Sequence, residues 1–225
     1  MAYMTNALDI NATPPSFTVT CWNCRGLLAC GSSVELYLYF HRPSILIIIE
    51  PLLSKKTHRD FPKFPNYNVV LCKHPFGQHH GGFVVYFHKS ITYSQHEAPH
   101  FTSSTSSTAA MFHSPSAMLT KPFTLVPLYM SSKAPTHDWK KLTEFMTGAP
   151  YTYTDDEMPV LIMGDVNAHN PLWDNSYPPS YYEPAGSRLS SFLSDDNDWH
   201  VLNLQMPELV PTRISSRPNQ RDTVI

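Results

Sequence analysis

The sequence predicts an α/β fold in which strands form mixed sheets covered by helices. Apolar runs of strand length recur along the chain, and segments with helical spacing lie between them. The chain has 21 Pro but only 8 Gly, which favours short elements joined by stiff loops over a helical bundle. Its 225 residues are enough for one domain with a substantial core.

The predicted strands are runs rich in β-branched and aromatic residues. Pro127 suits an edge strand or a bulge, because proline has no N–H for a sheet ladder. The last run has only begun where the sequence stops. The predicted strands are Phe17–Trp22, Ile45–Ile49, Gly81–Phe87, Phe123–Tyr129, Val160–Gly164 and the run that follows Asp222.

Three segments are predicted helices. The first, Ser32–Arg42, has a Ser cap and ends before Pro43, although its alternating Leu and Tyr leave a strand open. The second, Thr136–Met146, has apolar residues at helical spacing, with Thr136 as its cap. The third runs from Ser187 to about Asp195. Strands and helices in this order predict an α/β arrangement with antiparallel parts.

Composition excludes several classes of protein. Sixteen Lys and Arg against 18 Asp and Glu give a net charge of −2, so no overall basic field points to nucleic acid. Residues 1–16, an N-terminal segment that we expect to be disordered, contain no secretory signal. The apolar run at 45–53 is too short to span a membrane. The four cysteines are too unevenly placed for a disulfide framework, and together these features predict an intracellular protein.

Polar residues stand at the ends of the predicted strands. Glu50 follows the isoleucine run, Asp165 and Asn167 follow Met163-Gly164, and Asp222 precedes the last run. Strand ends of an open α/β sheet border a common crevice, so these groups can converge there. Their hard oxygen atoms suit Mg²⁺, with Mn²⁺ as the alternative. Taken singly, each residue is also explained by the ordinary change from strand to loop.

Several motifs occur in one order along the chain. They are the series CWNCRGL at 21–27, the strand-ending Glu50, Gly81-Gly82 before a strand, Tyr129 at the end of another, and MGDVNAHNPLW at 163–173. This order resembles the endonuclease/exonuclease/phosphatase superfamily, and more narrowly the endonuclease domain of non-LTR (LINE-type) retrotransposons. The resemblance covers residues 17–225, including Pro211-Thr212 and the segment around Asp222.

The resemblance implies a role for each matching residue. Asn23 and Glu50 would hold the metal, and Tyr129 would contact the scissile phosphate. Asp165 would orient or deprotonate the attacking water, with Asn167 supporting the water or the phosphorane. The remaining residues that it implies are Asp222, which matches a late acidic position, and Arg25 and His169, which are candidate DNA contacts.

The resemblance also implies a fold and an activity. The fold is a DNase I-like four-layer α/β sandwich, in which two facing mixed sheets are flanked by helices. The activity is Mg²⁺-dependent nicking of DNA, which in a retrotransposon primes reverse transcription by a domain of the same polyprotein. A nuclear or cytoplasmic location follows from this interpretation.

The chain departs from the family pattern at two places. Asp174 replaces a Gly that follows the Trp, and the sequence ends at Ile225, before the family's S-D-H strand. We therefore expect a domain whose last strand is missing. A catalytically dead remnant or a binding module is the alternative function. A phospholipid or inositol phosphatase of the same superfamily is disfavoured by the NAHNPLW extension.

A zinc site is the competing metal hypothesis. Cys21 and Cys24 form a CxxC, and three histidines cluster at 74, 79 and 80. Residues three apart on a strand point to opposite faces, and the sequence has no second CxxC. This spacing disfavours zinc.

Overall fold

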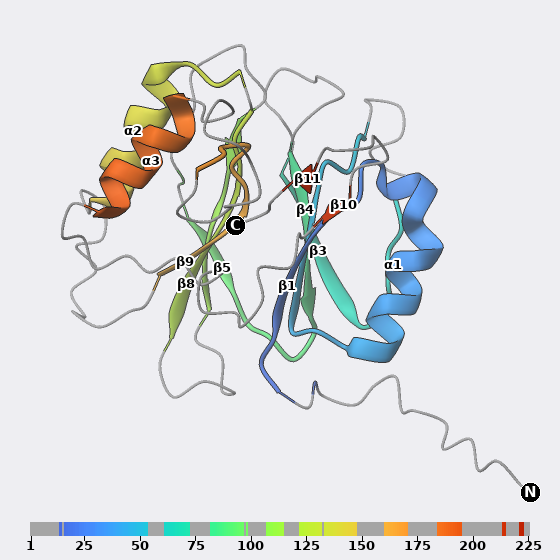
Figure 1. The fold of residues 1–225 in the computed structure, drawn as a ribbon. Helices are drawn as coiled ribbons and strands as arrows, with labels where there is room; N and C mark the ends of the chain where they lie inside the picture. The colour runs from blue at the N-terminus through green and yellow to red at the C-terminus, as the bar shows by residue number, and fades with distance from the viewer. Residues whose placement is uncertain are drawn as a thin grey trace, which may run out of the picture.

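Two sheets face each other in the computed structural model, and helices cover their outer sides (Figure 1). The predicted four-layer α/β sandwich is therefore confirmed. The structure describes residues 14, 16–53, 61–72, 82–96, 98, 107–114, 122–131, 133–147, 160–170, 184–194, 213–214 and 221–222. The segment 1–16, predicted to be disordered, lies almost entirely outside these residues.

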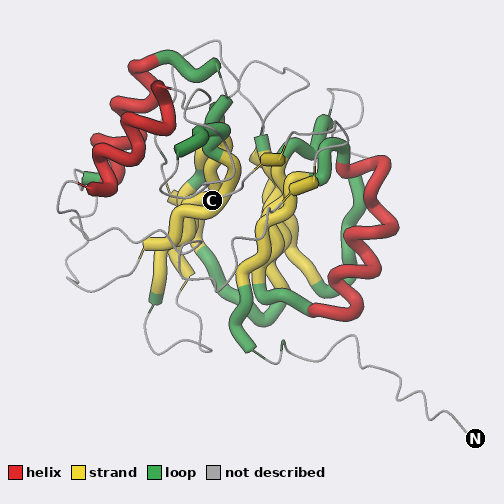
Figure 2. Tube along the Cα trace, in the orientation of Figure 1, coloured by secondary structure: helices red, strands yellow, loops and turns green. Residues whose placement is uncertain are grey.

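The first sheet contains the N-terminal strands. Its order is β1-β2-β4-β3, with β1 (Val19–Asn23), β2 (Ile45–Ile49), β4 (Phe83–His88) and β3 (Tyr67–Cys72). The pair β1–β2 is parallel and the other pairs are antiparallel. The crossover between the parallel strands is α1 (Leu27–His41), which lies on the outer face of the sheet (Figure 2).

The second sheet is built around β8 (Phe123–Tyr129). One edge of β8 pairs with β6 (Thr108–Ala109) and β7 (Met111–Ser114), and β5 (Ser94–His96) pairs with β7. The strand β9 (Val160–Asp165) runs parallel to β8. The outer layer contains α2 (Thr136–Met146) and α3 (Pro184–Ser194), and a separate two-stranded sheet contains β10 (Arg213–Ile214) and β11 (Arg221–Asp222).

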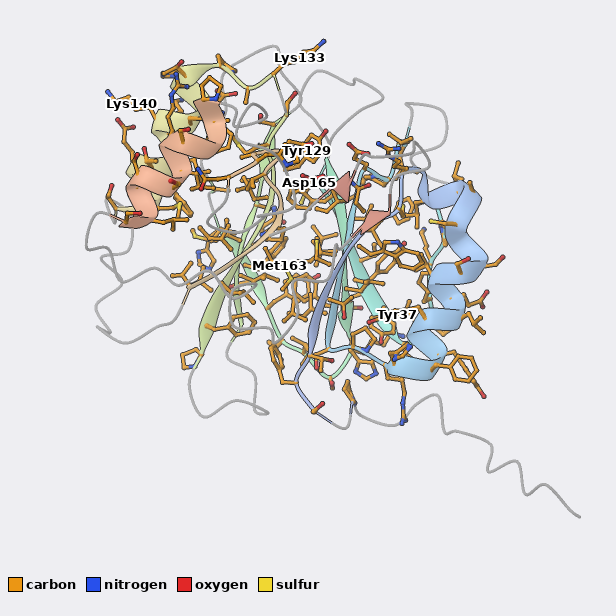
Figure 3. The ribbon with its side chains drawn as sticks, viewed as in Figure 1. Tyr37, Tyr129, Lys133, Lys140, Met163 and Asp165 are labelled. Carbon is orange, nitrogen blue, oxygen red and sulfur yellow. The ribbon has the colours of Figure 1, made fainter. Side chains whose placement is uncertain are left out.

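The side chains of β2 alternate between two cores. Ile45, Ile47 and Ile49 belong to the cluster between the sheets, where Met163 of β9 also packs (Figure 3). Leu46 and Ile48 pack on the other face against α1. A strand covered on both faces needs a continuous apolar run, which explains the uninterrupted ILIII sequence. Because β2 is packed on both faces, it holds the following residue, Glu50, in place at the end of the sheet.

Two predicted helix starts are wrong, those of the first and the third helix, since α3 begins at Pro184 rather than at Ser187. The first helix begins at Leu27 rather than Ser32, because Gly26 with φ 127° ends the preceding loop and its carbonyl accepts from the N–H of Ala29 and Cys30. Thr136 is the first residue of α2 and makes no capping bond, and the N-cap is Pro135. The helix α1 therefore starts four residues after Asn23, the last residue of β1.

Of the two positions expected for Pro127, an edge strand or a bulge, the edge strand is wrong, since β8 has neighbours on both sides. The N–H of Ala110 donates to the Pro127 carbonyl at 3.2 Å, and proline has no N–H to return this bond. The interruption between β6 and β7 falls opposite this residue. The proline thus breaks one ladder locally and keeps its place in the middle of the sheet.

The exposed large apolar side chains found in the described ranges all lie on α1. They are Leu28, Leu36, Tyr39 and Phe40. The inner face of the same helix packs on the first sheet through buried Leu27, Val34 and Leu38. In the described part of the chain no helix is both long and apolar enough to cross a membrane.

Candidate active site

The carboxyl ends of four strands, two from each sheet, meet at one end of the sandwich. Asn23 is the last residue of β1, and Glu50 directly follows β2. Tyr129 and Asp165 end β8 and β9, where they are register partners (Figure 3). Because both β1–β2 and β8–β9 are parallel pairs, each pair presents its carboxyl ends at the same edge.

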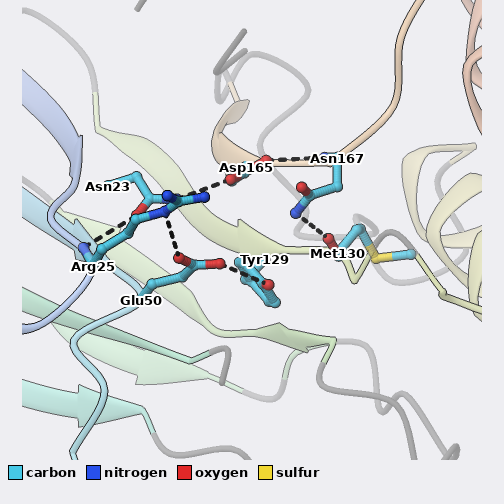
Figure 4. A network of polar contacts seen from close by, with 7 residues as sticks. All are labelled: Asn23, Arg25, Glu50, Tyr129, Met130, Asp165 and Asn167. Carbon is cyan, nitrogen blue, oxygen red and sulfur yellow. Dashed lines mark hydrogen bonds and ion pairs between the residues drawn. The ribbon is translucent and has the colours of Figure 1, made fainter. Parts of the chain in front are cut away.

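Two side-chain hydrogen bonds join the sheets at this end (Figure 4). The Asn23 amide Nδ2 donates to Asp165 Oδ2 at 3.0 Å. The Tyr129 hydroxyl donates to Glu50 Oε1 at 3.0 Å. The partners are 142 and 79 residues apart in sequence, so only the packing of the two sheets brings them together.

Asp165 is held from several directions. The Asn167 N–H donates to Asp165 Oδ1 at 2.9 Å, which leaves both carboxylate oxygens with a donor. The Asn167 Nδ2 donates to the Met130 carbonyl at 2.8 Å, and the Met130 N–H donates to the Asp165 carbonyl at 2.8 Å. Asp165 is only 6% exposed, so these contacts fix its orientation within a nearly closed environment.

Arg25 lies over the same network. Its N–H donates to Asn23 Oδ1 at 3.3 Å, and its Nε lies 4.0 Å from Glu50 Oε2. The Arg25 side chain is 57% exposed, whereas that of Glu50 is 18% exposed. A cation therefore stands at the solvent side of the otherwise acidic site.

The backbone around these residues adopts an uncommon conformation. Arg25, Glu50 and Asn167 all have positive φ, at 49°, 51° and 45°. Few residues other than glycine adopt this region, and such outliers concentrate at functional sites. Hydrogen bonds from Gly26 N–H to the Glu50 carbonyl and from Leu27 N–H to the Pro51 carbonyl, both 3.0 Å, hold the first two loops together.

The close approach of β9 to β8 explains why residue 164, directly before Asp165, is a glycine. A Cβ at this position would lie 1.7 Å from the Leu128 carbonyl oxygen on β8. Only glycine therefore permits the observed approach of β9 to β8. This requirement is a signal that the GDxN motif contains but that the sequence prediction did not use.

Burial and charge keep the Tyr129 phenol protonated. The pKa of Tyr129 is raised above its usual value, first by burial, then by the negative charge of Glu50 and by the hydrogen bond to it, and further by Asp165. Tyr129 is therefore a hydrogen-bond donor at neutral pH and cannot serve as a base there.

The structure brings together six of the predicted site residues. They are Asn23, Arg25, Glu50, Tyr129, Asp165 and Asn167. His169 is half-buried, and its backbone carbonyl lies against Gly186 of α3, where a Cβ would come within 1.9 Å. Its contact with DNA stays a prediction.

Other predictions are outside what the structure describes. Asp222 lies in β11, where its backbone pairs with Arg213, but its side chain is not among the described parts. The histidines at 74, 79 and 80 are outside the described residues. No sequence pattern could indicate the Met130 carbonyl, since any residue supplies this group.

The CxxC pair points to opposite faces of the first sheet. Cys21 packs in the cluster between the sheets, whereas Cys24 packs on the side of α1 with Cys30. Burial and then a hydrogen bond with Cys30 raise the pKa of Cys24 to about 12. Cys21 and Cys24 therefore point in opposite directions, as their spacing on a strand predicted.

The donor set at the site fits a hard divalent cation. Magnesium is commonly bound through one or two carboxylates, with water and substrate oxygens completing its coordination. Glu50 and Asp165 supply carboxylates, and Asn23 supplies an amide oxygen. No group of three or more His, Cys, Asp or Glu that could hold a metal occurs among the described residues.

Solved structures show the same fold. No family model matches the sequence, and no curated protein does. The endonuclease domain of TRAS1, a telomere-specific non-LTR retrotransposon, matches with a TM-score of 0.59 and 16% identity, covering 93% of this chain and 82% of that one. The AP endonuclease LMAP from Leishmania major has a TM-score of 0.61 and 12% identity, covering 79% of this chain and 66% of that one.

The Xenopus laevis APE2 catalytic domain has a TM-score of 0.55 and 16% identity, covering 77% of this chain and 67% of that one. At these identities the likeness establishes the fold. The chain therefore has a fold of the endonuclease/exonuclease/phosphatase type, which confirms the resemblance at this level.

Proposed function

We propose that this protein is a Mg²⁺-dependent phosphodiesterase that nicks one strand of DNA. The observation that carries the proposal is the hydrogen-bonded network of Asn23, Glu50, Tyr129, Asp165 and Asn167 across the ends of two sheets. Such a network places a buried carboxylate, a phenol donor and amide groups around one point. These groups suit hydrolysis of a phosphate diester.

Each residue has a role in this proposal. Asp165 orients the attacking water and accepts its proton, because its carboxylate is fixed by Asn23 and Asn167. Tyr129 donates a hydrogen bond to a nonbridging phosphate oxygen when its contact with Glu50 is exchanged. Asn167 supports the water through Oδ1, which can accept a hydrogen bond from it, or the phosphorane through Nδ2 when its bond to the Met130 carbonyl is exchanged.

Glu50 and Asn23 would hold Mg²⁺, with Mn²⁺ as an alternative. When bound, the ion supplies positive charge where negative charge accumulates on the phosphate. Asp222 is retained as a contributor from the late motif.

DNA is the substrate that we favour. The similar structures include an AP endonuclease and the endonuclease domain of a retrotransposon, and the NAHNPLW extension follows the GDxN core in this sequence. We further propose that the nick primes reverse transcription by a domain of the same polyprotein. His169 is the proposed DNA contact in the extension.

Nicking of supercoiled plasmid by the purified chain tests this function. We expect open circles with Mg²⁺ and none with a chelator. Asp165→Asn, which removes the charge but keeps the shape, should lower the rate by about 10³-fold. The matched control is Glu144→Gln, which removes a carboxylate that is 59% exposed on α2 and should not change the rate.

Nicking that persists in chelator or in Asp165→Asn would contradict the proposal. A folded chain that binds DNA without nicking it would instead favour the alternative of a binding module. Circular dichroism melts of each variant show whether the fold is retained.

A further inference from the structure

We propose that Arg25 binds the phosphodiester directly and that its guanidinium changes partner from Glu50 to the phosphate when DNA binds. This inference rests on the proposed function, because it names how the same site attracts its substrate. The inference goes beyond the proposed function because it assigns to Arg25 a direct contact between a cation and the phosphate.

The charge of the site requires such a contact. Of the seven residues drawn in Figure 4, Glu50 and Asp165 are acidic and Arg25 is the only cation. A phosphodiester that approaches two carboxylates is repelled unless positive charge offsets them. The chain as a whole has a net charge of −2, so no general basic field compensates. Among the residues drawn in Figure 4, Arg25 is the one that can supply this positive charge before a metal ion binds.

The contact between Arg25 and Glu50 is suited to exchange. Its Nε–Oε2 distance of 4.0 Å is long for an ion pair, and the Arg25 side chain is 57% exposed. Exposed ion pairs of this kind contribute little to stability, so breaking one costs little. A guanidinium can donate two parallel hydrogen bonds to the oxygens of a phosphate. The 4.0 Å distance to Glu50 Oε2 is too long for such a hydrogen bond.

The backbone holds Arg25 in place over the network. Its φ of 49° lies in a region that glycine or asparagine usually occupies, and this conformation is sterically unfavourable for arginine. The conformation is maintained by the bonds from Arg25 N–H to Asn23 Oδ1 and from Gly26 N–H to the Glu50 carbonyl. Arg42 also has a positive φ, but it ends α1, where this conformation is common.

The shared partner predicts opposite effects on two ligands. A cation next to Glu50 disfavours a second cation at the same carboxylate and favours an anion. Removal of the Arg25 charge should therefore weaken DNA binding and strengthen Mg²⁺ binding. A general loss of structure at the site would weaken both.

DNA binding is measured in chelator, so that it does not depend on catalysis. The probe is a fluorescent duplex oligonucleotide, followed by anisotropy over a range of salt concentrations. Arg25→Gln should weaken binding about tenfold and reduce the salt slope by about one. Arg25→Lys should recover the salt slope but only part of the affinity, because it keeps the charge without the fork.

The matched control is Lys140→Gln, which removes an exposed cation on α2 that pairs with Glu144 at 3.5 Å. We expect it to leave affinity for DNA almost unchanged. Titration with Mg²⁺ alone, followed by calorimetry, should show tighter binding to Arg25→Gln than to the natural chain. Melting curves confirm that both variants are folded.

Equal DNA affinity and salt slope for Arg25→Gln and the natural chain would overturn the inference. Weaker binding of both DNA and Mg²⁺ would also overturn it, because this result indicates a structural role. Failure of the proposed function has a different signature. In that case DNA binding depends on Arg25, but the natural chain does not nick plasmid with Mg²⁺.

Discussion

The two ends of the first sheet satisfy their polar groups in different ways. At the end opposite the site, the Tyr67 hydroxyl donates to the Pro43 carbonyl at 2.9 Å, and His88 Nδ1 lies 2.8 Å from Ser90 Oγ. These partners come from the same sheet and its loops. At the site end, Asn23 and Glu50 both contact Arg25, and each also has a hydrogen-bond partner on the second sheet.

The difference separates structural polar groups from the candidate catalytic ones. The contacts at the opposite end depend only on the first sheet and border a cavity of about 160 Å³ between α1 and the strands. The contacts at the site end depend on how closely the two sheets and the pair β8–β9 approach each other. The site is therefore sensitive to changes in packing that leave the opposite end intact.

The largest effect is expected for Gly164→Ala. The added Cβ would lie 1.7 Å from the Leu128 carbonyl, so β9 must separate from β8. We expect a loss of about 4 kcal/mol or more in the free energy of unfolding, measured by urea denaturation. Unchanged stability would mean that the approach of β9 to β8 is not required. Gly31→Ala is the comparison, since its Cβ would meet only the Pro62 side chain.

Asn167→Ala should have the next largest effect on stability. It leaves the buried Met130 carbonyl without the Asn167 Nδ2 donor and places alanine at a φ of 45°. We expect a loss of about 2–3 kcal/mol by the same measurement. Asn167→Gly should recover part of this loss, because glycine tolerates the backbone conformation but makes no hydrogen bond.

Tyr129→Phe tests one bond between the sheets. The variant keeps the ring in the core but removes the donor to Glu50 at 3.0 Å. The expected loss in stability is about 1 kcal/mol, whereas nicking should fall by about 10²-fold. Equal activity of Tyr129→Phe and the natural chain would show that this phenol takes no part. Tyr67→Phe at the opposite end should affect stability alone.

The smallest effect is a pH dependence at the opposite end. Burial, and next the charge of Arg42, lower the pKa of His88 below its usual 6.5. The unfolded chain therefore binds a proton at a higher pH than the folded chain does. His88 contributes full stability above pH 6.5, and this contribution falls as the pH drops toward the folded pKa.

The melting temperature of His88→Gln should therefore change less between pH 7.5 and 5.5 than that of the natural chain. His137→Gln, a change at an exposed position on α2, is the control and should behave as the natural chain does. Identical pH dependence in all three proteins would contradict the assignment to His88.

Several elements were predictable because their sequences have a clear pattern. The bounds of α2 agree with the prediction at both ends, since its apolar residues follow helical spacing. The start of α1 was not predicted correctly, because this helix is apolar on most sides and Ser32 resembles a cap. The place of Pro127 was missed because proline is rare in interior strands.

Local sequence pattern was enough to predict which residues end the strands and which chemical groups they carry. Strand runs, the GDxN core and the positions of Asn23, Glu50 and Tyr129 were all readable from local pattern. The hydrogen-bond partners depend on how the chain packs in three dimensions: Asn23 with Asp165, Tyr129 with Glu50, and Asn167 with Met130. The reason is that period-2 alternation fixes which way a side chain points, whereas its distance to a residue 142 positions away depends on the packing of two sheets.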